Sequence, residues 1–342
     1  MHTTMITGTT GFIGRHVVAE ARSRGVPLRL MSRRRPPVPA GPTRPDHAVP
    51  GGPVRPDRAV TGRPAGPEHA VPGAAVERGV VADLARPESL RGTCDGVDVL
   101  LHCASQIGGA ADVNEAVNAR GTAALVAEAE RAGVRRIVYL STASVYGRGT
   151  FRSAGPEELE RRPGSPTSRT RAAAEDVVRA AGGIVLRPHL VYGAGDTWAV
   201  PALAWLLRAL SGASAGWDAR MSAVAAPELA RLVLGVGSAP AGSLTASVYH
   251  AAHPRPVTTA NLLRAVAGCM ELPASGARMT VQQARARLTA ASLPHHALDM
   301  LATDHWFDSA PLWADLDQTP GPGFAADFAE TREWYRSVVR AA

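Results

Sequence analysis

Lysine does not occur anywhere in the 342-residue sequence, and all 37 of its basic residues are arginine. This absence excludes every mechanism that needs a lysine amine as a base, a nucleophile or part of a proton relay. The formal net charge is +7, but the arginines are spread along the chain and the densest run covers only residues 33–35. We therefore expect no binding to nucleic acid.

Cysteine and long apolar runs are also scarce. The chain has three cysteines, Cys94, Cys103 and Cys269, and their spacing is not that of a metal site. An odd number of cysteines favours a reducing compartment over secretion. The first residues contain no apolar targeting run, and no apolar stretch of about 18 residues follows. We expect a cytoplasmic protein without metal or membrane contact, large enough for one α/β domain with a smaller lobe.

Proline and glycine are concentrated in a predicted insertion at residues 33–74. It contains three eleven-residue units at residues 41–73, GPTRPDHAVPG, GPVRPDRAVTG and RPAGPEHAVPG. Proline lacks a backbone donor and glycine favours a flexible chain, so neither a helix nor a sheet ladder is expected here. The units also lack the apolar face that solenoid repeats stack. We expect a solvated, disordered surface loop without a function of its own.

Short apolar runs alternate with helical patterns in the first half of the chain. Strands rich in β-branched residues are predicted at residues 2–7, 27–32, 75–82, 97–104, 135–142 and 183–188. Helical patterns cover residues 12–24 and 118–133, and the second ends on Gly133. Such alternation is typical of a Rossmann-type α/β fold, a doubly wound parallel sheet with helices on both faces.

Beyond residue 190 the pattern becomes irregular. Helices are expected near residues 198–211, 227–236, 258–270 and 325–340. We therefore expect a dinucleotide-binding domain over residues 1–190. Residues 191–342 are expected to form mainly a smaller substrate-binding lobe, which closes over the carboxyl edge of the sheet.

The segment ITGTTGFIG, residues 6–14, places three glycines in a GxxGxxG spacing between the first predicted strand and helix. Glycines let the backbone approach a pyrophosphate, and the helix N-terminus supplies N–H donors and positive potential. Glycines of a simple turn are the alternative, but this strand-to-helix context is the one that a dinucleotide requires. The pattern predicts cofactor contacts around Gly8, Thr10, Gly11, Phe12 and Ile13, with Gly14 as the third glycine.

The end of the second predicted strand indicates which dinucleotide is bound. NAD-binding folds place a carboxylate there for the ribose diol, whereas this chain offers Ser32, Arg33 and Arg34 and no acid. Guanidinium groups suit a 2′-phosphate, so we expect NADP(H) as the cofactor. A solvated basic loop that leads into the insertion is the alternative.

Six motifs occur in a fixed order along the chain. They are GxxGxxG, Asp83-Leu84, VDVLLHCAS at 97–105, NARGT at 118–122, STASVYG at 141–147 and LRPHLVYGAGD at 186–196. Together they resemble the extended short-chain dehydrogenase/reductases, the NAD-dependent epimerase/dehydratase family, over residues 2–340. The resemblance implies a nicotinamide dinucleotide. It implies contacts from Asp83 and Leu84 on the adenine side, from Cys103, Ala104 and Ser105 near the nicotinamide ribose, and from Pro188, His189, Leu190 and Val191 near the amide.

The residues that carry the family's chemistry are partly missing. Relatives use a Ser or Thr after the fifth strand and a Tyr-x-x-x-Lys pair on the next helix. Thr142 fits the first position, but SPTSRTRAAAE, residues 165–175, has Thr167 and Arg171 at the tyrosine and lysine positions. None of the five tyrosines precedes an arginine by four residues, so no shift in register restores the pair. Arg171 can still bond a ribose, whereas Thr167 is a poor acid near pH 7 and can equally serve as a helix-capping residue.

The missing proton has several candidate sources. His102 ends a buried strand and is expected to be a core residue. His189 is a candidate donor or substrate contact, whereas Tyr146 and Tyr192 belong to VYG signatures that are framework in relatives. A ketone with a neighbouring phenol, as in polycyclic aromatic polyketides, can also supply the proton itself.

Tryptophans in the second half suit a flat aromatic ligand. Trp205 is expected to pack in the core, whereas Trp198 and Trp217 are better pocket candidates. The expected substrate contacts are Ser105, Gln106, Ala143, Ser144, His189, Trp198 and Trp217.

The leading hypothesis is an NADPH-dependent ketoreductase that acts on a polycyclic aromatic polyketide of the angucyclinone type, with a substrate-assisted proton supply. In its arginine-only composition and lost pair the chain resembles the atypical ketoreductases of simocyclinone-type antibiotic pathways. A sugar-nucleotide epimerase or dehydratase is one alternative, and a non-catalytic NADP(H) sensor or partner-binding protein is another. The sequence leaves the ketone, its stereochemistry and the oligomeric state open.

Overall fold

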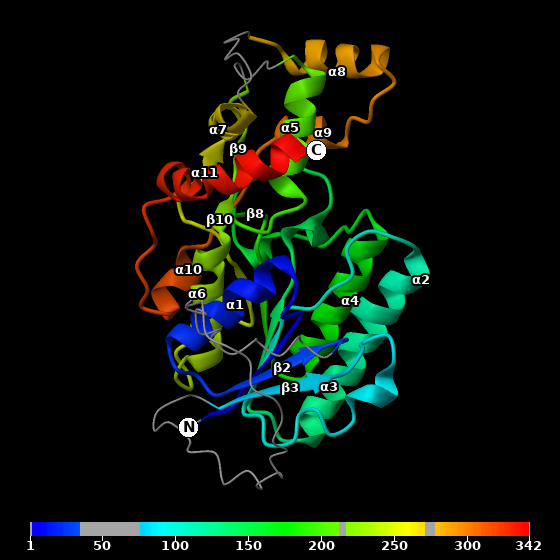
Figure 1. Ribbon diagram of the computed structural model, residues 1–342, viewed down its shortest axis with the longest axis vertical. Coiled ribbons are helices and arrows are strands. Elements are labelled where there is room, and N and C mark those ends of the chain that lie inside the picture. The colour runs from blue at the N-terminus through cyan, green and yellow to red at the C-terminus, as the bar shows by residue number, and fades with distance from the viewer. Residues whose placement is uncertain (1, 35–75, 212–216, 271–277, 342) are drawn as a thin grey trace, which may run out of the picture.

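The computed structural model describes residues 2–34, 76–211, 217–270 and 278–341 (Figure 1). The three eleven-residue units, and all but the first two residues of the predicted insertion at 33–74, lie outside the described residues. Within this described part of the chain, no helix combines the length and the apolar composition that crossing a membrane requires.

Seven parallel strands form the large sheet, in the order β11-β7-β5-β4-β1-β2-β3. Their bounds are β1 Thr4–Thr7, β2 Leu28–Ser32, β3 Glu77–Val81, β4 Val99–His102, β5 Arg136–Leu140, β7 Ile184–Arg187 and β11 Val248–His250. The first six correspond to the six predicted strands, and the doubly wound α/β fold is confirmed. β11 was not predicted, because three residues are too few for a periodic signal. The strand order reverses between β1 and β4, the place where such sheets bind dinucleotides.

Helices cover both faces of the large sheet (Figure 1). On one face, α1 Phe12–Ser23 packs against α6 Ala226–Ser238. On the other face, α3 Gly121–Arg131 packs against α4 Pro166–Ala180. A π-helical turn, Glu115–Arg120, joins α3 to the short α2, Ala111–Asn114. The predicted helices at 12–24 and 118–133 are confirmed, but the second begins earlier than expected because this turn extends it.

A lobe lies above the carboxyl edge of the sheet and contains two small sheets. One pairs β8 Leu190–Tyr192 with β10 Ala223–Ala225, and the other has the order β12-β9-β13-β6. The strands of the second are β6 Phe151–Ala154, β9 Arg220–Met221, β12 Val257–Thr258 and β13 His305–Phe307. The remaining helices are α5 Ala199–Ala209, α7 Thr259–Met270, α8 Val281–Ala290, α9 His296–Leu301, α10 Ala310–Asp315 and α11 Phe324–Ala341. All four helices predicted after residue 190 are confirmed as α5, α6, α7 and α11.

Segments from each side of residue 190, the predicted domain boundary, pack with the other half of the structure. β6 comes from the first half of the sequence but pairs with β13 of the lobe. β11 and α6 come from the second half but belong to the large sheet and its cover. The loops at the carboxyl edge of the sheet therefore meet segments from both halves of the chain.

Candidate cofactor and active site

The loop between β1 and α1 is fixed by close backbone packing. Gly8 has a φ of 69°, and a Cβ on it would lie 2.7 Å from the backbone nitrogen of Ala104. A Cβ on Gly14 would lie 2.0 Å from the carbonyl oxygen of Gly8. Gly11 caps α1, whose first turn has no acidic residue and no side-chain cap. This arrangement fits a pyrophosphate, because the first turn of α1 has no side-chain cap on its N–H groups and no acidic residue that would repel an anion. Of the other predicted loop residues, Thr10 is exposed, and Phe12 and Ile13 are half-buried in the first turn of α1.

The ends of β2 and β3 carry the residues expected at the adenosine end. The hydroxyl of Ser32, the last residue of β2, donates to the carbonyl oxygen of Arg34 at 2.5 Å. Arg33 and Arg34 are exposed. Asp83 follows β3, and its carboxylate accepts a backbone N–H two residues further on at 3.0 Å, while Leu84 is buried. Two guanidinium groups therefore stand at the strand end where a ribose phosphate would lie in such a fold.

His102, at the end of β4, is bonded between two threonines in the core. Its Nδ1 lies 2.7 Å from Thr7 Oγ1, and its Nε2 lies 3.0 Å from Thr122 Oγ1. Burial lowers the pKa of His102 to about 3, so the ring is neutral near pH 7. This histidine is a core residue, as the sequence interpretation favoured, and both its nitrogens are occupied.

The next residues leave β4 toward the glycine loop. Cys103, Ala104, Ser105 and Gln106 are half-buried, and the Ala104 N–H donates to Thr7 Oγ1 at 3.2 Å. Burial raises the pKa of the Cys103 thiol to about 12, so this cysteine is not a thiolate near pH 7. The segment can therefore contact a cofactor or substrate by packing and by hydrogen bonds, but not as a nucleophile.

Thr142 follows β5 and caps a short 3-10 helix, Ala143–Tyr146. Its Oγ1 accepts the Ser144 N–H at 3.1 Å and donates to Ser144 Oγ at 3.1 Å. Thr142 is half-buried and Ser144 is exposed, so two adjacent hydroxyls face outward. Ala143, a predicted substrate contact, is 3% exposed and packs with Tyr146. Its N–H donates to the Pro188 carbonyl oxygen at 2.8 Å.

A buried ion pair supports this loop. The Glu175 carboxylate, on α4, accepts from Arg187 Nη2 at 2.5 Å and from Arg187 Nε at 3.0 Å, and also from the Ser141 hydroxyl. Arg187 Nη1 donates to the Tyr146 hydroxyl at 2.7 Å, and that hydroxyl lies 2.7 Å from His250 Nε2. Buried charges require such partners, since leaving one unpaired is costly. The residues of this buried network are Ser141, Tyr146, Glu175, Arg187 and His250.

The two tyrosines of the VYG signatures are therefore structural. Tyr146 is 1% exposed and bonded within the buried network, and burial raises its pKa. Tyr192 is equally buried, its hydroxyl donates to Asp327 Oδ2 at 3.3 Å, and burial raises its pKa strongly. Neither phenol is placed to give a proton to a ligand.

Thr167 and Arg171 lie one turn apart on α4, at the family's tyrosine and lysine positions. Thr167 Oγ1 donates to Asn114 Oδ1 at 2.8 Å and accepts the Gly108 N–H at 3.1 Å. Arg171 is 8% exposed, and its Nη2 donates to the carbonyl oxygen of Leu140. Its Nε is buried without a hydrogen-bond partner. An unsatisfied guanidinium nitrogen at this place fits a ligand that carries hydroxyl groups, such as a ribose.

His189, which precedes β8, stacks on His305 with the ring centres 5.6 Å apart. Its Nε2 is buried without a hydrogen-bond partner. Burial lowers the pKa of His189 to about 3, and the neighbouring His305 and His250 add to the effect. The ring is therefore neutral near pH 7 and can make one further hydrogen bond, but it does not carry a surplus proton. The other residues of this segment are Pro188 and Leu190, which are buried, and Val191, which is half-buried.

The three tryptophans lie in different surroundings. Trp198, just before α5, is 60% exposed. Trp205 packs against the core of the lobe, as predicted. Trp217 corrects an expectation: it is 3% exposed within that core, and its Nε1 donates to the Met279 carbonyl oxygen at 2.6 Å. Trp217 is therefore buried, and its one polar atom is satisfied inside the protein.

Several residues of the site were missed by sequence reasoning. Asn114 bonds Thr167, and Glu175, Arg187 and His250 belong to the buried network. A signal existed for two of them: Arg187 ends the apolar strand IVLR, and Glu175 follows three alanines on a buried helical face. A charge in such a position requires a buried counter-charge.

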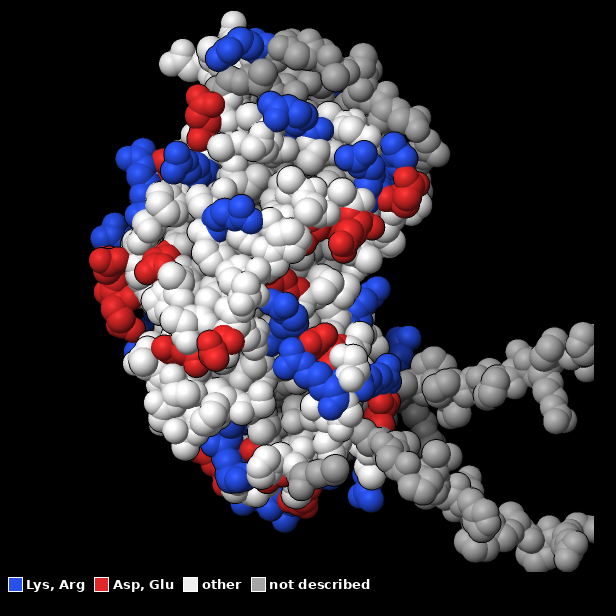
Figure 2. Space-filling view, turned by 90° about the vertical axis from the view of Figure 1, so that its left-hand side faces the viewer, with Lys and Arg blue, Asp and Glu red and all other residues white. Residues whose placement is uncertain are grey.

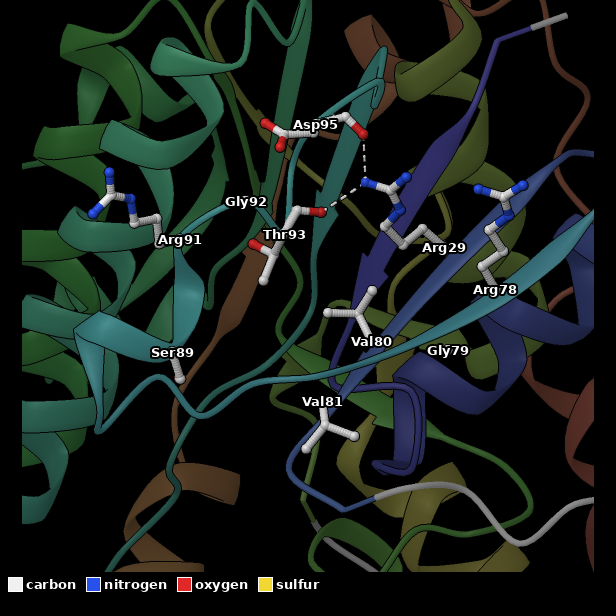
Figure 3. A pocket seen from close by; sticks show the side chains of 10 residues that line it. All are labelled: Arg29, Arg78, Gly79, Val80, Val81, Ser89, Arg91, Gly92, Thr93 and Asp95. Atoms are coloured by element: carbon white, nitrogen blue, oxygen red, sulfur yellow. Dashed lines mark hydrogen bonds between the residues drawn. The ribbon is translucent and has the colours of Figure 1, made fainter.

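The surface shows where space remains. Figure 2 shows the face of α6, α10 and α11, on which acidic side chains lie beside arginines, and the hollow between the lobe and the sheet half is seen at the right-hand edge of this view. A separate hollow of about 420 Å³ lies beside β2 and β3 (Figure 3). There, Arg29 Nη1 donates to the carbonyl oxygens of Thr93 at 2.9 Å and Asp95 at 2.6 Å. None of the residues that line this second hollow is a predicted site residue.

Known relatives agree with this arrangement. Residues 4–214, more than half of the chain, match the NAD dependent epimerase/dehydratase family. A 2-alkyl-3-oxoalkanoate reductase of Stenotrophomonas maltophilia is 35% identical over 133 residues, which cover 36% of this chain and 40% of the relative. A 4-hydroxy-2-methyl-3-oxo-4-farnesyl-3,4-dihydroquinoline-1-oxide ketoreductase of Stigmatella aurantiaca is 26% identical over 209 residues, covering 58% and 53%. The matches thus span about half or less of the length of these relatives.

Solved structures share the fold over almost the whole chain. A short-chain dehydrogenase/reductase superfamily protein from Agrobacterium tumefaciens with bound NAD superposes with a TM-score of 0.69 at 18% identity, covering 99% of both chains. The enzyme WbmH of Bordetella bronchiseptica, in complex with NAD+, gives 0.69 at 18% identity and covers 98% of this chain and 99% of that one.

The two relatives are named as reductases, and the two solved structures contain NAD or NAD+. The glycine loop, the strand order that reverses beside it and the match over residues 4–214 lead to one conclusion. This chain belongs to the NAD dependent epimerase/dehydratase family, the extended short-chain dehydrogenase/reductases.

Proposed function

We propose that this protein is an NADPH-dependent ketoreductase that reduces a carbonyl of a polycyclic aromatic polyketide, of the angucyclinone type, in antibiotic biosynthesis. The observation that carries the proposal is that the candidate proton donors of the protein are bonded internally or neutral. Tyr146 and His102 are bonded within the protein, and His189 is a neutral ring. A substrate that brings its own proton needs only a hydrogen bond at its carbonyl oxygen. The Thr142 hydroxyl can donate one when its proton turns away from the exposed Ser144 hydroxyl, to which it donates at 3.1 Å in this structure.

The residues that would hold NADPH are those of the sheet edge. The backbone of the glycine loop, next to Gly8, would bind the pyrophosphate, and Arg33 and Arg34 would bind the 2′-phosphate. The unsatisfied Nε of Arg171 would bond the nicotinamide ribose. When bound, NADPH supplies the hydride that reduction of a ketone requires.

The chain's own contribution to the reaction is orientation and one hydrogen bond. Thr142 would hold the carbonyl oxygen, and such a donor commonly lowers a barrier by about 3 kcal/mol. Ser105, Gln106, Ser144, His189 and Trp198 would surround the rest of a flat ligand. The proton on the new alcohol oxygen would come from the phenol beside the substrate's carbonyl, which makes the family's tyrosine dispensable. The names of two relatives, a reductase and a ketoreductase, support this class of reaction.

The same lack of an available acid supports a second candidate, a non-catalytic NADP(H)-binding sensor or partner protein. The family also contains epimerases and dehydratases, so a degenerate sugar-nucleotide enzyme is the third. These candidates differ in measurable ways. A sensor binds NADPH without consuming it, and an epimerase or dehydratase retains NAD through purification.

The test compares an angucyclinone that has a free phenol beside its ketone with the methyl ether of that phenol. With NADPH oxidation as the measurement, methylation is expected to lower kcat by about 100-fold or more, the usual worth of a general acid. Thr142→Val is expected to lower kcat by about 100-fold to 1,000-fold, while Thr142→Ser retains most of it. Thr167→Ala is expected to change kcat far less than methylation does.

Each outcome decides between the candidates. Small and equal effects of methylation and Thr167→Ala contradict a substrate-assisted proton supply. NADPH binding without turnover of any ketone favours the sensor. Copurified NAD favours the epimerase or dehydratase. The same assay with NADH tests the cofactor, since the double variant Arg33→Ala/Arg34→Ala should lose its preference for NADPH.

A further inference from the structure

The loop of residues 104–110, between β4 and α2, lies beside α4. It carries Ser105 and Gln106, and it ends with Gly108 and Gly109, whose φ values of 67° and 78° are left-handed. Ile107 is 48% exposed, one of the few large apolar side chains on the surface of the described residues. An irregular loop has no ladder to satisfy its backbone, so other groups must bond it.

Asn118 satisfies the first half of this loop. The Gln106 N–H donates to Asn118 Oδ1 at 2.7 Å, and Asn118 Nδ2 donates back to the Gln106 carbonyl oxygen at 3.0 Å. Asn118 is 1% exposed and lies in the π-helical turn before α3. One side-chain amide therefore bonds both backbone groups of Gln106, as a paired strand would.

Thr167 and Asn114 satisfy the second half in the same way. Thr167 Oγ1 accepts the Gly108 N–H at 3.1 Å, and Asn114 Nδ2 donates to the Gly108 carbonyl oxygen at 2.8 Å. The ring closes because Thr167 Oγ1 donates its proton to Asn114 Oδ1 at 2.8 Å. Thr167, Asn114 and Gly108, from α4, α2 and the loop between β4 and α2, form what we call the Thr167 latch.

The chemistry of the latch assigns a role to the residue at the family's tyrosine position. The proton of the Thr167 hydroxyl is committed to an amide oxygen, so it is not directed at a ligand. A threonine hydroxyl sits on Cβ, close to the backbone, and its branching restricts the χ1 angle. A tyrosine hydroxyl lies at the far end of its ring, so it could not occupy the same place between Gly108 and Asn114.

We propose that Thr167 is a positioning residue whose latch fixes the loop of residues 104–110 as one wall of the substrate site. That wall presents Ile107 and Gln106 to a flat, largely apolar ketone, and this part of the inference rests on the proposed function. The exchange of tyrosine for threonine thus replaces an acid by a structural contact. This contact of Thr167 orders the loop of residues 104–110, the wall that a large aromatic substrate would contact.

The experiment uses the full chain and the variants Thr167→Val and Thr167→Ser. Valine keeps the shape but cannot bond, and serine keeps the hydroxyl. Thr331→Val is the matched control, because Thr331 is also half-buried on a helix and its hydroxyl donates to the Phe328 carbonyl oxygen at 3.1 Å. Amide hydrogen exchange, read by mass spectrometry on peptides that cover residues 104–110, measures whether the loop is fixed.

Thr167→Val is expected to raise the exchange rate of this loop by about tenfold, which corresponds to the loss of one or two hydrogen bonds. Thr167→Ser should stay close to the wild-type rate, and Thr331→Val should not alter the loop. With an angucyclinone ketone as substrate, Thr167→Val should raise KM by about tenfold and change kcat by about twofold or less, since the loop binds and does not react.

Wild-type exchange in the Thr167→Val variant, or a Thr167→Ser variant that behaves like valine, overturns the proposal. So does a large loss of kcat with unchanged KM, because that pattern belongs to an acid. If the wild-type protein reduces no ketone, the proposed function fails. The exchange measurement needs no turnover, so it still decides whether Thr167 fixes the loop.

Discussion

The loop after β1 and the loop after β5 lie at the same edge of the sheet, but different forces stabilise them. The first depends on close backbone packing, since a Cβ on Gly8 would collide with the main chain of Cys103 and Ala104, and a Cβ on Gly14 with that of Gly8. The second, residues 141–146, depends on side chains that are far apart in sequence, Glu175 and His250 among them. The first loop is therefore sensitive to an added atom, and the second to a lost partner.

The two loops differ in how much substitution they tolerate. In the proposed function the glycine loop binds the pyrophosphate, which all such dinucleotides share, and this role leaves little freedom for substitution. The network behind the second loop fixes Thr142 without using any residue of the lost Tyr-x-x-x-Lys pair. The chain could lose that pair and still keep Thr142 in position.

Removal of the Glu175 carboxylate is expected to have the largest effect. Glu175→Ala leaves the Arg187 guanidinium buried without a counter-charge, so the free energy of unfolding should fall by about 3–5 kcal/mol. Urea unfolding followed by circular dichroism measures the change. Glu333→Ala is the control: Glu333 pairs with Arg336 at 2.6 Å but is 81% exposed, and its loss should cost about 1 kcal/mol at most.

A loss for Glu175→Ala no larger than that of the control would show that the second loop does not depend on the buried ion pair. If Glu175→Ala does not fold, Glu175→Gln still tests the charge. Glutamine keeps much of the shape and one acceptor oxygen but leaves Arg187 without its counter-charge, so it should also destabilise the fold.

A side chain in the glycine loop is expected to have the next largest effect. Gly8→Ala places a Cβ 2.7 Å from the Ala104 nitrogen, which should weaken NADPH binding by about 100-fold, or about 2.7 kcal/mol. Gly25→Ala is the matched control, because Gly25 has a similar φ of 65° but a Cβ there meets nothing within 4 Å. Both variants should lose about 1 kcal/mol of stability from the left-handed backbone.

Titration of NADPH fluorescence measures the binding. Equal affinities of the Gly8→Ala and Gly25→Ala variants would mean that the close approach of the backbone is not what forms the cofactor site. In that case the function of the first loop would not depend on its glycine packing, and this difference from the second loop would not hold.

A lower pH is expected to have the smallest effect on stability. Burial lowers the pKa of His102, His189 and His250 to about 3 each, whereas an unfolded histidine titrates near pH 6.5. Below about pH 6.5 the unfolded chain therefore binds protons that the folded chain does not, so stability is lost as the pH falls. Between pH 7.5 and pH 6.5 the three rings together should cost about 1 kcal/mol.

Urea unfolding at the two pH values checks this, and carboxylates contribute little there because they are ionised at both. A stability that is unchanged or higher at pH 6.5 would contradict the neutral, buried state of the three histidines. His250 is bonded to Tyr146, and His189 lies near it, so acid should act on the second loop more than on the first.

Much of the fold follows from local signals in the sequence. The six predicted strands, the first helix and the glycine loop depend on alternation and on glycines within a few residues of one another. β11 and the pairing of β6 with β13 were not predictable, because short strands carry no period and their partners lie far away in sequence, more than a hundred residues in the case of β6 and β13. The same reason hid the contacts of Trp217 and Ala143, which sequence alone placed beside a substrate.

The sequence by itself determined the Rossmann fold, the glycine loop, the arginines after β2 and the absence of a lysine or a usable tyrosine on α4. Each of these is a property of residue types and short spacings. Only the tertiary structure decided which roles Tyr146 and Thr167 have. It bonds Tyr146 between Arg187 and His250, and it directs the Thr167 hydroxyl to Asn114 and Gly108. These roles depend on which distant polar groups become buried together, because a buried group must find its partner wherever the fold places one.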